Sequence, residues 1–310
     1  MQLVNEQPAL SWRDAYLKQA QTHPYSTLGL AIAVLVVALL LIVSLWHIAI
    51  GNANEALWPG LLGGVAGFVA TAIGALPALF LRGLSDRIED TMLGAAAGMM
   101  LAASSFSLIL PGLAAGEQIA GNGVVGGLIV VVGLTLGVLL MLGLDNFIPH
   151  EHTHLGPCGA GCGRVGRVWL FVFAIALHNL PEGMAIGVSF SHGDMSVGLP
   201  LTTAIVLQDI PEGLAVAMAL KAAGFSPWRA VLIGVVSGLM EPLGALLGIQ
   251  LASGLALAYP IGLGLAAGAM IFVVSHEVIP ETHRNGHQTP ASIGLMAGFA
   301  LMMLLDTTLG

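Results

Sequence analysis

The chain has 310 residues, of which 56% are apolar and only 8% are charged, with a formal net charge of −8. Its mean hydropathy is +0.91. A soluble protein carries roughly a quarter of its residues as charged side chains, so lipid is the expected solvent of this chain. Nine Lys and Arg provide no basic patch for phosphate, and two cysteines build no disulfide framework. A cytosolic enzyme, a nucleic-acid binder and a disordered scaffold are therefore excluded.

Apolar runs long enough to cross a bilayer follow a polar segment, residues 1–26, which does not resemble a cleavable signal peptide. The alternating ten-residue segments of a membrane β-barrel are not visible. The predicted fold class is an all-α polytopic membrane protein with an inverted repeat. Nine transmembrane helices are predicted, at residues 27–50, 60–82, 91–113, 123–145, 167–190, 198–222, 227–254, 258–279 and 290–309.

The basic residues test this count. With nine spans and the N-terminus in the cytoplasm, all nine Lys and Arg fall on the cytoplasmic side, as the positive-inside rule requires. We predict a multi-pass protein of the cell (inner) membrane with its C-terminus outside the cytoplasm. Several spans also carry glycines four residues apart, a spacing that lets helices pack closely. These pairs are Gly94 and Gly98, Gly133 and Gly137, Gly264 and Gly268, and Gly294 and Gly298.

The longest predicted loop, residues 146–166, is cytoplasmic and rich in residues that bind metals. It contains His150, Glu151, His152, His154, Cys158 and Cys162. Two cysteines in C-x3-C spacing beside histidines could bind zinc, although the spacing is looser than that of a zinc finger. A solvated polar linker is the alternative interpretation.

Ionisable residues gather at the middles of three consecutive predicted spans, where each costs about 3 kcal/mol to insert and is therefore expected to be functional. The segments are HNLPEG at 178–183, QDIPEG at 208–213 and EP at 241–242. The first two are one pattern written twice. Because adjacent spans run antiparallel, the repeat is inverted across the midplane, which is typical of a transporter.

The spacing predicts which side chains lie together. Residues i and i+4 share a helix face, so His178 faces the same way as Glu182, and Gln208 the same way as Glu212. Asn179 and Asp209 lie on the adjoining flank. The prolines of the three segments each remove a backbone N–H and free a carbonyl, which predicts broken helices lining a cavity.

Glu182, Asp209, Glu212 and Glu241 bring up to four negative charges, and no Lys or Arg lies near the centre of a span. A buried negative cluster needs a cation, which protons or metal ions must supply. Imidazole, carboxylate and amide oxygens suit zinc first, then iron, manganese, cobalt or cadmium. Two ions sharing Glu182 and Glu212 would balance the charge.

These motifs resemble the signature helices of the ZIP (Zrt/Irt-like) metal transporters, over residues 60–310, and most closely bacterial members with a binuclear centre. The resemblance implies an eight-helix core, with 27–50 as an added peripheral helix, and uptake of Zn²⁺ and often Cd²⁺ into the cytoplasm. By the same resemblance, one ion would bind Met100, His178, Glu182, Gln208 and Glu212. The second would bind Asn179, Asp209 and Glu241 and share the two bridging glutamates.

We expect alternating access, in which the third, fifth, sixth and seventh spans move against the others. Outer access would pass Ser107 and Met100. The predicted exit path consists of Asp145, His150, His152, His276, Glu277, Glu281 and His283. The partners are divalent ions and the bilayer, with no nucleic acid and no organic cofactor, and a homodimer is left open.

A channel and an enzyme are the two alternatives to a carrier. A narrow metal-selective channel with fixed sites remains the main alternative. An intramembrane metalloenzyme is disfavoured, because the chain has no H-E-x-x-H motif and its ligand set leaves little room for an activated water. No enzymatic activity is expected.

Overall fold

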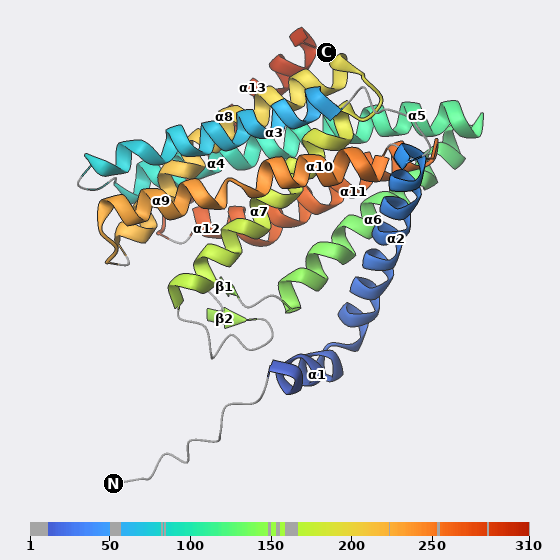
Figure 1. Ribbon diagram of the computed structural model, residues 1–310. Coiled ribbons are helices and arrows are strands. Elements are labelled where there is room, and N and C mark those ends of the chain that lie inside the picture. The colour runs from blue at the N-terminus through green and yellow to red at the C-terminus, as the bar shows by residue number, and fades with distance from the viewer. Residues whose placement is uncertain are drawn as a thin grey trace.

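The computed structural model describes residues 12–49, 57–81, 83, 85–147, 150–152, 156–158, 167–222, 224–252, 255–283 and 285–309. Almost all of this is helix (Figure 1). The first half contains α1 (Trp12–Thr22), α2 (Pro24–Ala49), α3 (Leu57–Ala75) with the 3₁₀ turn η1 (Leu76–Leu79), α4 (Asp86–Ala103), the π-helical η2 (Ser104–Ile109), α5 (Leu110–Ala120) and α6 (Gly123–Phe147). The second half contains α7 (Arg167–Phe190), α8 (Met195–Ala222), α9 (Pro227–Ser237), α10 (Met240–Ala252), α11 (Ala258–Val273), the π-helical η4 (Val274–Val278), α12 (Ile279–Thr282) and α13 (Gln288–Leu309).

Seven helical stretches of the described chain are long and apolar enough to cross a membrane, as expected of a multi-pass membrane protein. They are Leu57–Leu79, Asp86–Ala120, Gly123–Phe147, Met195–Lys221, Pro227–Ala252, Ala258–Thr282 and Gln288–Leu309. The other two predicted spans coincide with α2 and α7, helices of 26 and 24 residues. The count of nine spans stays a prediction.

Two elements were not predicted. The helix α1 lies within the polar N-terminal segment, and Gln19 Nε2 donates to the Asn146 carbonyl over 2.7 Å, which ties α1 to the end of α6. The predicted 146–166 loop contains a two-stranded antiparallel sheet, β1 (His150–His152) with β2 (Gly156–Cys158). His154 and Cys162 lie outside the described residues, as do the side chains of the two strands, so the zinc-binding expectation for this loop stays untested.

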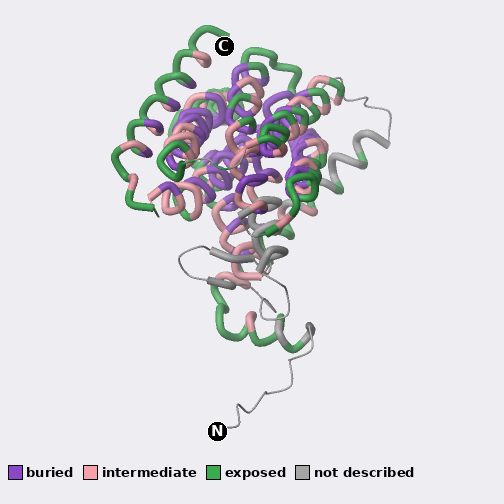
Figure 2. The backbone as a smooth tube through the Cα atoms, turned by 90° about the vertical axis from the view of Figure 1, so that its left-hand side faces the viewer, coloured by how far each residue is buried: buried purple, intermediate pink, exposed green. Residues whose placement is uncertain are grey.

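Many exposed residues of the bundle are large and apolar. The buried residues gather in the interior of the bundle, and the exposed ones lie on its outside (Figure 2). Leu35, Val124 and Leu304 are 70%, 75% and 58% exposed, on α2, α6 and α13. Exposed apolar side chains along whole helices are costly in water and favourable in lipid. This exposure pattern agrees with the exclusion of a soluble protein.

Glycines set the closest helix pairs, as their spacing predicted. A Cβ added at Gly98 would overlap the backbone of α13, and one at Gly298 would overlap that of α4. Gly137 and Gly268 form the same arrangement between α6 and α11. Without side chains at these points, the backbones approach closely enough for extensive van der Waals contact.

The prolines of the repeated motif act differently from the prediction. The helices α7 and α8 continue through Pro181 and Pro211, so the expectation of broken helices is wrong for both. The seventh span is interrupted, because α9 ends at Ser237 and α10 starts at Met240. Both helices thus tolerate the hydrogen bond lost at the proline, whereas the seventh span breaks just before Pro242.

Candidate metal site

Three helices bring the predicted ligands together at the centre of the bundle. The helix α7 contributes Asn179 and Glu182, which are 2% and 0% exposed. The helix α8 contributes Gln208 and Asp209, at 0% and 1%, and α10 contributes Glu241, at 0%. His178 and Glu212 are half-buried on α7 and α8. The i, i+4 spacing thus places the two copies of the motif on facing sides of one polar centre.

The central carboxylates are close enough to share a cation. One oxygen each of Glu182, Asp209 and Glu212 lie within 4.8 Å of one another. Gln208 Nε2 donates to Glu182 Oε1 over 2.5 Å, so its amide oxygen faces away from this bond. Three acidic groups at this separation repel one another strongly in a medium of low dielectric constant, unless positive charge lies between them.

The strongest observation is a set of buried oxygens without hydrogen-bond partners among the described residues. Five of the six such atoms belong to predicted ligands: Asn179 Oδ1, Glu182 Oε2, Gln208 Oε1, Asp209 Oδ2 and Glu241 Oε2. The sixth is Thr202 Oγ1, which is not in the predicted ligand set. In folded proteins, most buried polar atoms have a partner, and leaving one unpaired is costly. Five unpaired acceptors from the predicted ligand set are what a cation site requires, since a cation satisfies acceptors and no donor is needed.

The helix α3 also reaches the site, which the sequence did not indicate. Thr71 Oγ1 donates to Glu241 Oε1 over 2.7 Å. One turn earlier, a Cβ added at Gly67 would overlap Glu241 Oε2 and lie 3.1 Å from Asp209 Oδ2. The signal in the sequence was weak, because one threonine and one glycine in an apolar span are common packing residues.

His178 has a carboxylate neighbour from the predicted exit path. Glu277 Oε2, in η4, lies 3.4 Å from His178 Nε2. His276, the residue before Glu277, has its Nε2 3.8 Å from Asp145 Oδ2 at the end of α6. Glu277 therefore borders the site itself, whereas the sequence placed it only near the inner end of its span.

The other exit-path residues are less closely linked to the site. His283 Nδ1 lies 2.7 Å from the Ile279 carbonyl within its own helical turn, and Glu281 is on α12. The side chains of His150 and His152 lie outside the described residues. The exit path as a whole stays a prediction.

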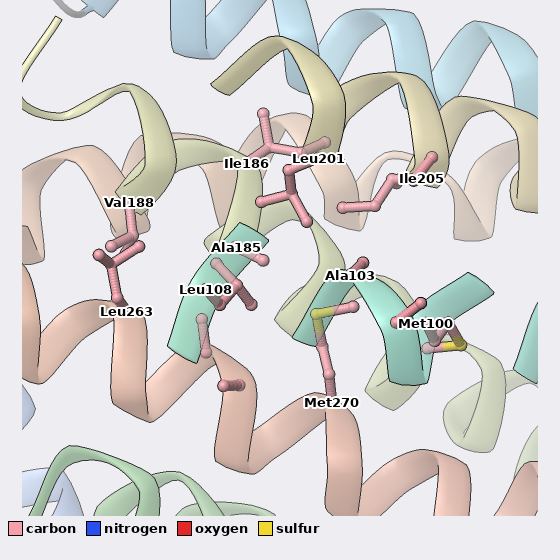
Figure 3. Packing of buried hydrophobic residues seen from close by; sticks show 14 of the residues in the cluster. Met100, Ala103, Leu108, Ala185, Ile186, Val188, Leu201, Ile205, Leu263 and Met270 are labelled. Atoms are coloured by element: carbon pink, nitrogen blue, oxygen red, sulfur yellow. The ribbon is translucent and has the colours of Figure 1, made fainter. Parts of the chain in front are cut away.

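Met100 is buried, at 2% exposed, in an apolar cluster with Ala103, Leu201, Ile205 and Met270. Figure 3 shows its thioether among these side chains. This surrounding agrees with a packing role, so the assignment of Met100 as a ligand stays a prediction that rests on the family resemblance.

Comparison with known proteins agrees with this chemistry. Residues 149–306 match the family model described as ZIP zinc transporter. The chain is 63% identical over 302 residues to the zinc transporter ZIPB of Bordetella bronchiseptica, covering 97% of this chain and 98% of that protein. It is 41% identical to the zinc transporter GufA of Myxococcus xanthus (81% and 99% covered) and 32% identical to human zinc transporter ZIP11 (83% and 99%). The chain belongs to the ZIP family of zinc transporters.

Proposed function

We propose that this protein is a secondary transporter that moves divalent transition-metal ions, zinc first, across the membrane into the cytoplasm. Metal-ion transport is the activity for which its relatives are named. The five unpaired buried oxygens carry the proposal for this chain. Cadmium, iron, manganese and cobalt are further candidate substrates, because carboxylate, amide and imidazole ligands rank these ions without selecting one.

The number of candidate ligand oxygens in the centre suits two ions better than one. The group of Glu182, Asp209 and Glu212 already supplies three carboxylates within bonding reach of one ion. Asn179, Gln208 and Glu241 add three more unpaired oxygens around it. Two divalent ions would neutralise four carboxylates, so we propose a binuclear site with Glu182 and Glu212 as the bridging residues.

Packing divides the helices into two groups, and we propose that these groups move relative to each other. The ligand group consists of α3, α7, α8, α9 and α10, and the support group of α4, α5, α6, α11 and α13. Every described glycine whose added Cβ would overlap the backbone of another helix does so within its own group. The sequence led us to expect that α4 moves with the ligands. In this grouping α3 takes that place, because α4 pairs with α13.

A fixed channel is disfavoured by a buried apolar cluster on the predicted outer side of the site. Leu108, Ala185, Ile186, Leu201 and Ile205 form a buried apolar cluster there (Figure 3). A hydrated divalent ion crosses such a region only at a large desolvation cost. Toward the predicted inner side lie Glu277, His276 and Asp145, which supports an ion path in that direction.

The proposal is tested with purified protein in liposomes, by measuring Zn²⁺ and Cd²⁺ uptake and counting bound metal per chain. We expect Glu182→Ala and Glu212→Ala to abolish uptake and to lose bound metal, because each removes a carboxylate shared by the ions. Glu117→Ala, at an exposed position on α5, is the matched control and should transport like the wild type. Wild-type uptake by both site variants would refute the assignment.

Carrier and channel are separated by labelling single cysteines in a background without Cys158 and Cys162. Alternating access predicts that metal changes the labelling of Leu201→Cys, in the outer apolar cluster, and of Val278→Cys, beside Glu277, in opposite directions. Labelling of both positions that never responds to metal would favour fixed sites.

A further inference from the structure

The helix α3 carries no ionisable side chain in its membrane-spanning part, yet it fixes one of the site's carboxylates. Thr71 is 4% exposed, and its hydroxyl donates to Glu241 Oε1 over 2.7 Å. The other oxygen, Glu241 Oε2, has no hydrogen-bond partner among the described residues. The threonine therefore occupies one oxygen of the carboxylate, and the other oxygen faces the Asp209 carboxylate with no hydrogen-bond donor beside it.

Gly67 lies one turn before Thr71 on the same face of α3, and it leaves space at this second oxygen. A Cβ at this position would overlap Glu241 Oε2 and lie 3.1 Å from Asp209 Oδ2. Both of these oxygens are buried without a partner. They belong to different helices, α10 and α8, and they flank the same point beside the α3 backbone.

We infer that Thr71 and Gly67 are positioning residues, which hold Glu241 as a one-oxygen ligand for a divalent cation shared with Asp209. This inference rests on the proposed function, since it concerns the same site. A carboxylate with two free oxygens can rotate or bind an ion through both of them. A hydrogen bond to one oxygen removes this freedom, in the way that outer partners orient the ligands of other metal sites.

The first experiment replaces the hydroxyl alone. Thr71→Val keeps the shape of the side chain and removes the donor, whereas Thr71→Ser keeps the donor. We expect Thr71→Val to raise the KM for Zn²⁺ uptake into liposomes and to weaken Zn²⁺ binding by about 10- to 100-fold, the range found when outer partners are removed. Thr71→Ser should restore both values, which a purely structural role of the side chain would not predict.

Thr135→Val is the control for this substitution, because Thr135 is exposed on α6 and its hydroxyl donates to the Val131 carbonyl of its own helix, over 2.8 Å, away from the site. It should transport and bind Zn²⁺ like the wild type. Thr71→Val with wild-type KM and Zn²⁺ affinity would overturn the inference and leave the proposed transport function intact. A wild-type protein that neither binds nor transports Zn²⁺ would instead remove the proposed function.

The second experiment fills the space at Gly67. Gly67→Ala should weaken Zn²⁺ binding, since the methyl group displaces the Glu241 carboxylate, while Gly127→Ala should not. At Gly127 the nearest atom to an added Cβ is a Leu113 side-chain carbon at 3.8 Å, an ordinary contact. Wild-type Zn²⁺ affinity of Gly67→Ala would contradict the assigned role of this glycine.

Discussion

At the scale of single residues, Glu277 contacts a proposed metal ligand, and its neighbour His276 contacts a second carboxylate. Its carboxylate lies 3.4 Å from His178 Nε2, and the neighbouring His276 reaches Asp145. A histidine that binds metal through one ring nitrogen is commonly oriented by a carboxylate at the other. If His178 binds the ion as proposed, Glu277 would orient its ring and lie next to it on the proposed exit path.

Glu277→Ala tests this double role. We expect Zn²⁺ uptake to fall by about 10- to 100-fold, as for other carboxylates that orient a metal-binding histidine. Uptake into liposomes and Zn²⁺ binding to detergent-solubilised protein are the measurements, with Glu117→Ala as the control. Unchanged uptake would show that His178 needs no carboxylate neighbour.

At the scale of helices, two prolines coincide with irregular turns. The π-helical segment Ser104–Ile109 ends two residues before Pro111, and Val274–Val278 ends two residues before Pro280. A proline cannot donate to the carbonyl four residues earlier and crowds it, so the helix widens locally. The second such segment carries His276 and Glu277, in keeping with the frequent occurrence of π-helical turns at functional positions.

The helices α7 and α10, which carry proposed ligands, also pack closely against each other beyond the site. A Cβ at Gly187 would overlap the Ala245 backbone, so Gly187→Val must push these helices apart. We expect a loss of roughly 1–3 kcal/mol in stability, the usual cost of overpacking, seen as a lower Tm in detergent. Gly127→Val, near only one side chain at 3.8 Å, is the control. Equal Tm values for the two variants would contradict a tight α7–α10 contact.

On the scale of the whole molecule, hydrogen bonds as well as close glycine contacts hold the helices of the ligand group together. Lys221 Nζ, at the end of α8, donates to the Ala78 and Leu81 carbonyls over 2.6 and 2.5 Å. These bonds join α8 to the 3₁₀ turn η1 and the residues just after it, which follow α3, and satisfy carbonyls that a helix end leaves free. Between the two groups, the apolar cluster around Leu201 and Leu263 offers side-chain packing, which can slide more readily than interlocked backbones.

Two cysteine pairs of equal geometry test relative movement of the groups. A Cβ added at Gly262 would lie 3.6 Å from the Ala252 Cβ, across the two groups, and one at Gly234 would lie 3.6 Å from the Ala75 Cβ, within the ligand group. Both separations suit a disulfide. We expect oxidation with diamide to stop Zn²⁺ uptake by the first pair, reversibly on reduction, and to leave the second pair active. A first pair that is fully cross-linked and still transports would exclude movement at this contact.

The sequence by itself determined the solvent and the helical class, and it predicted the residues of the metal site. Composition reveals lipid exposure because a chain with so few charges cannot cover itself with a polar surface. The repeated motif predicts the ligands, because carboxylates at bilayer depth are too costly to keep without a role. Helix periodicity then places His178 beside Glu182 and Gln208 beside Glu212, since these contacts are local.

Only the tertiary structure decided which helices belong together and what surrounds each ligand. The pairing of α4 with α13, the position of α3 beside Glu241 and the reach of Glu277 to His178 join residues far apart in the sequence. Such contacts depend on where side chains are missing as much as on where they are present. The space at Gly67 exists only because α8 and α10 point Asp209 and Glu241 toward it, and no local pattern in α3 records that arrangement.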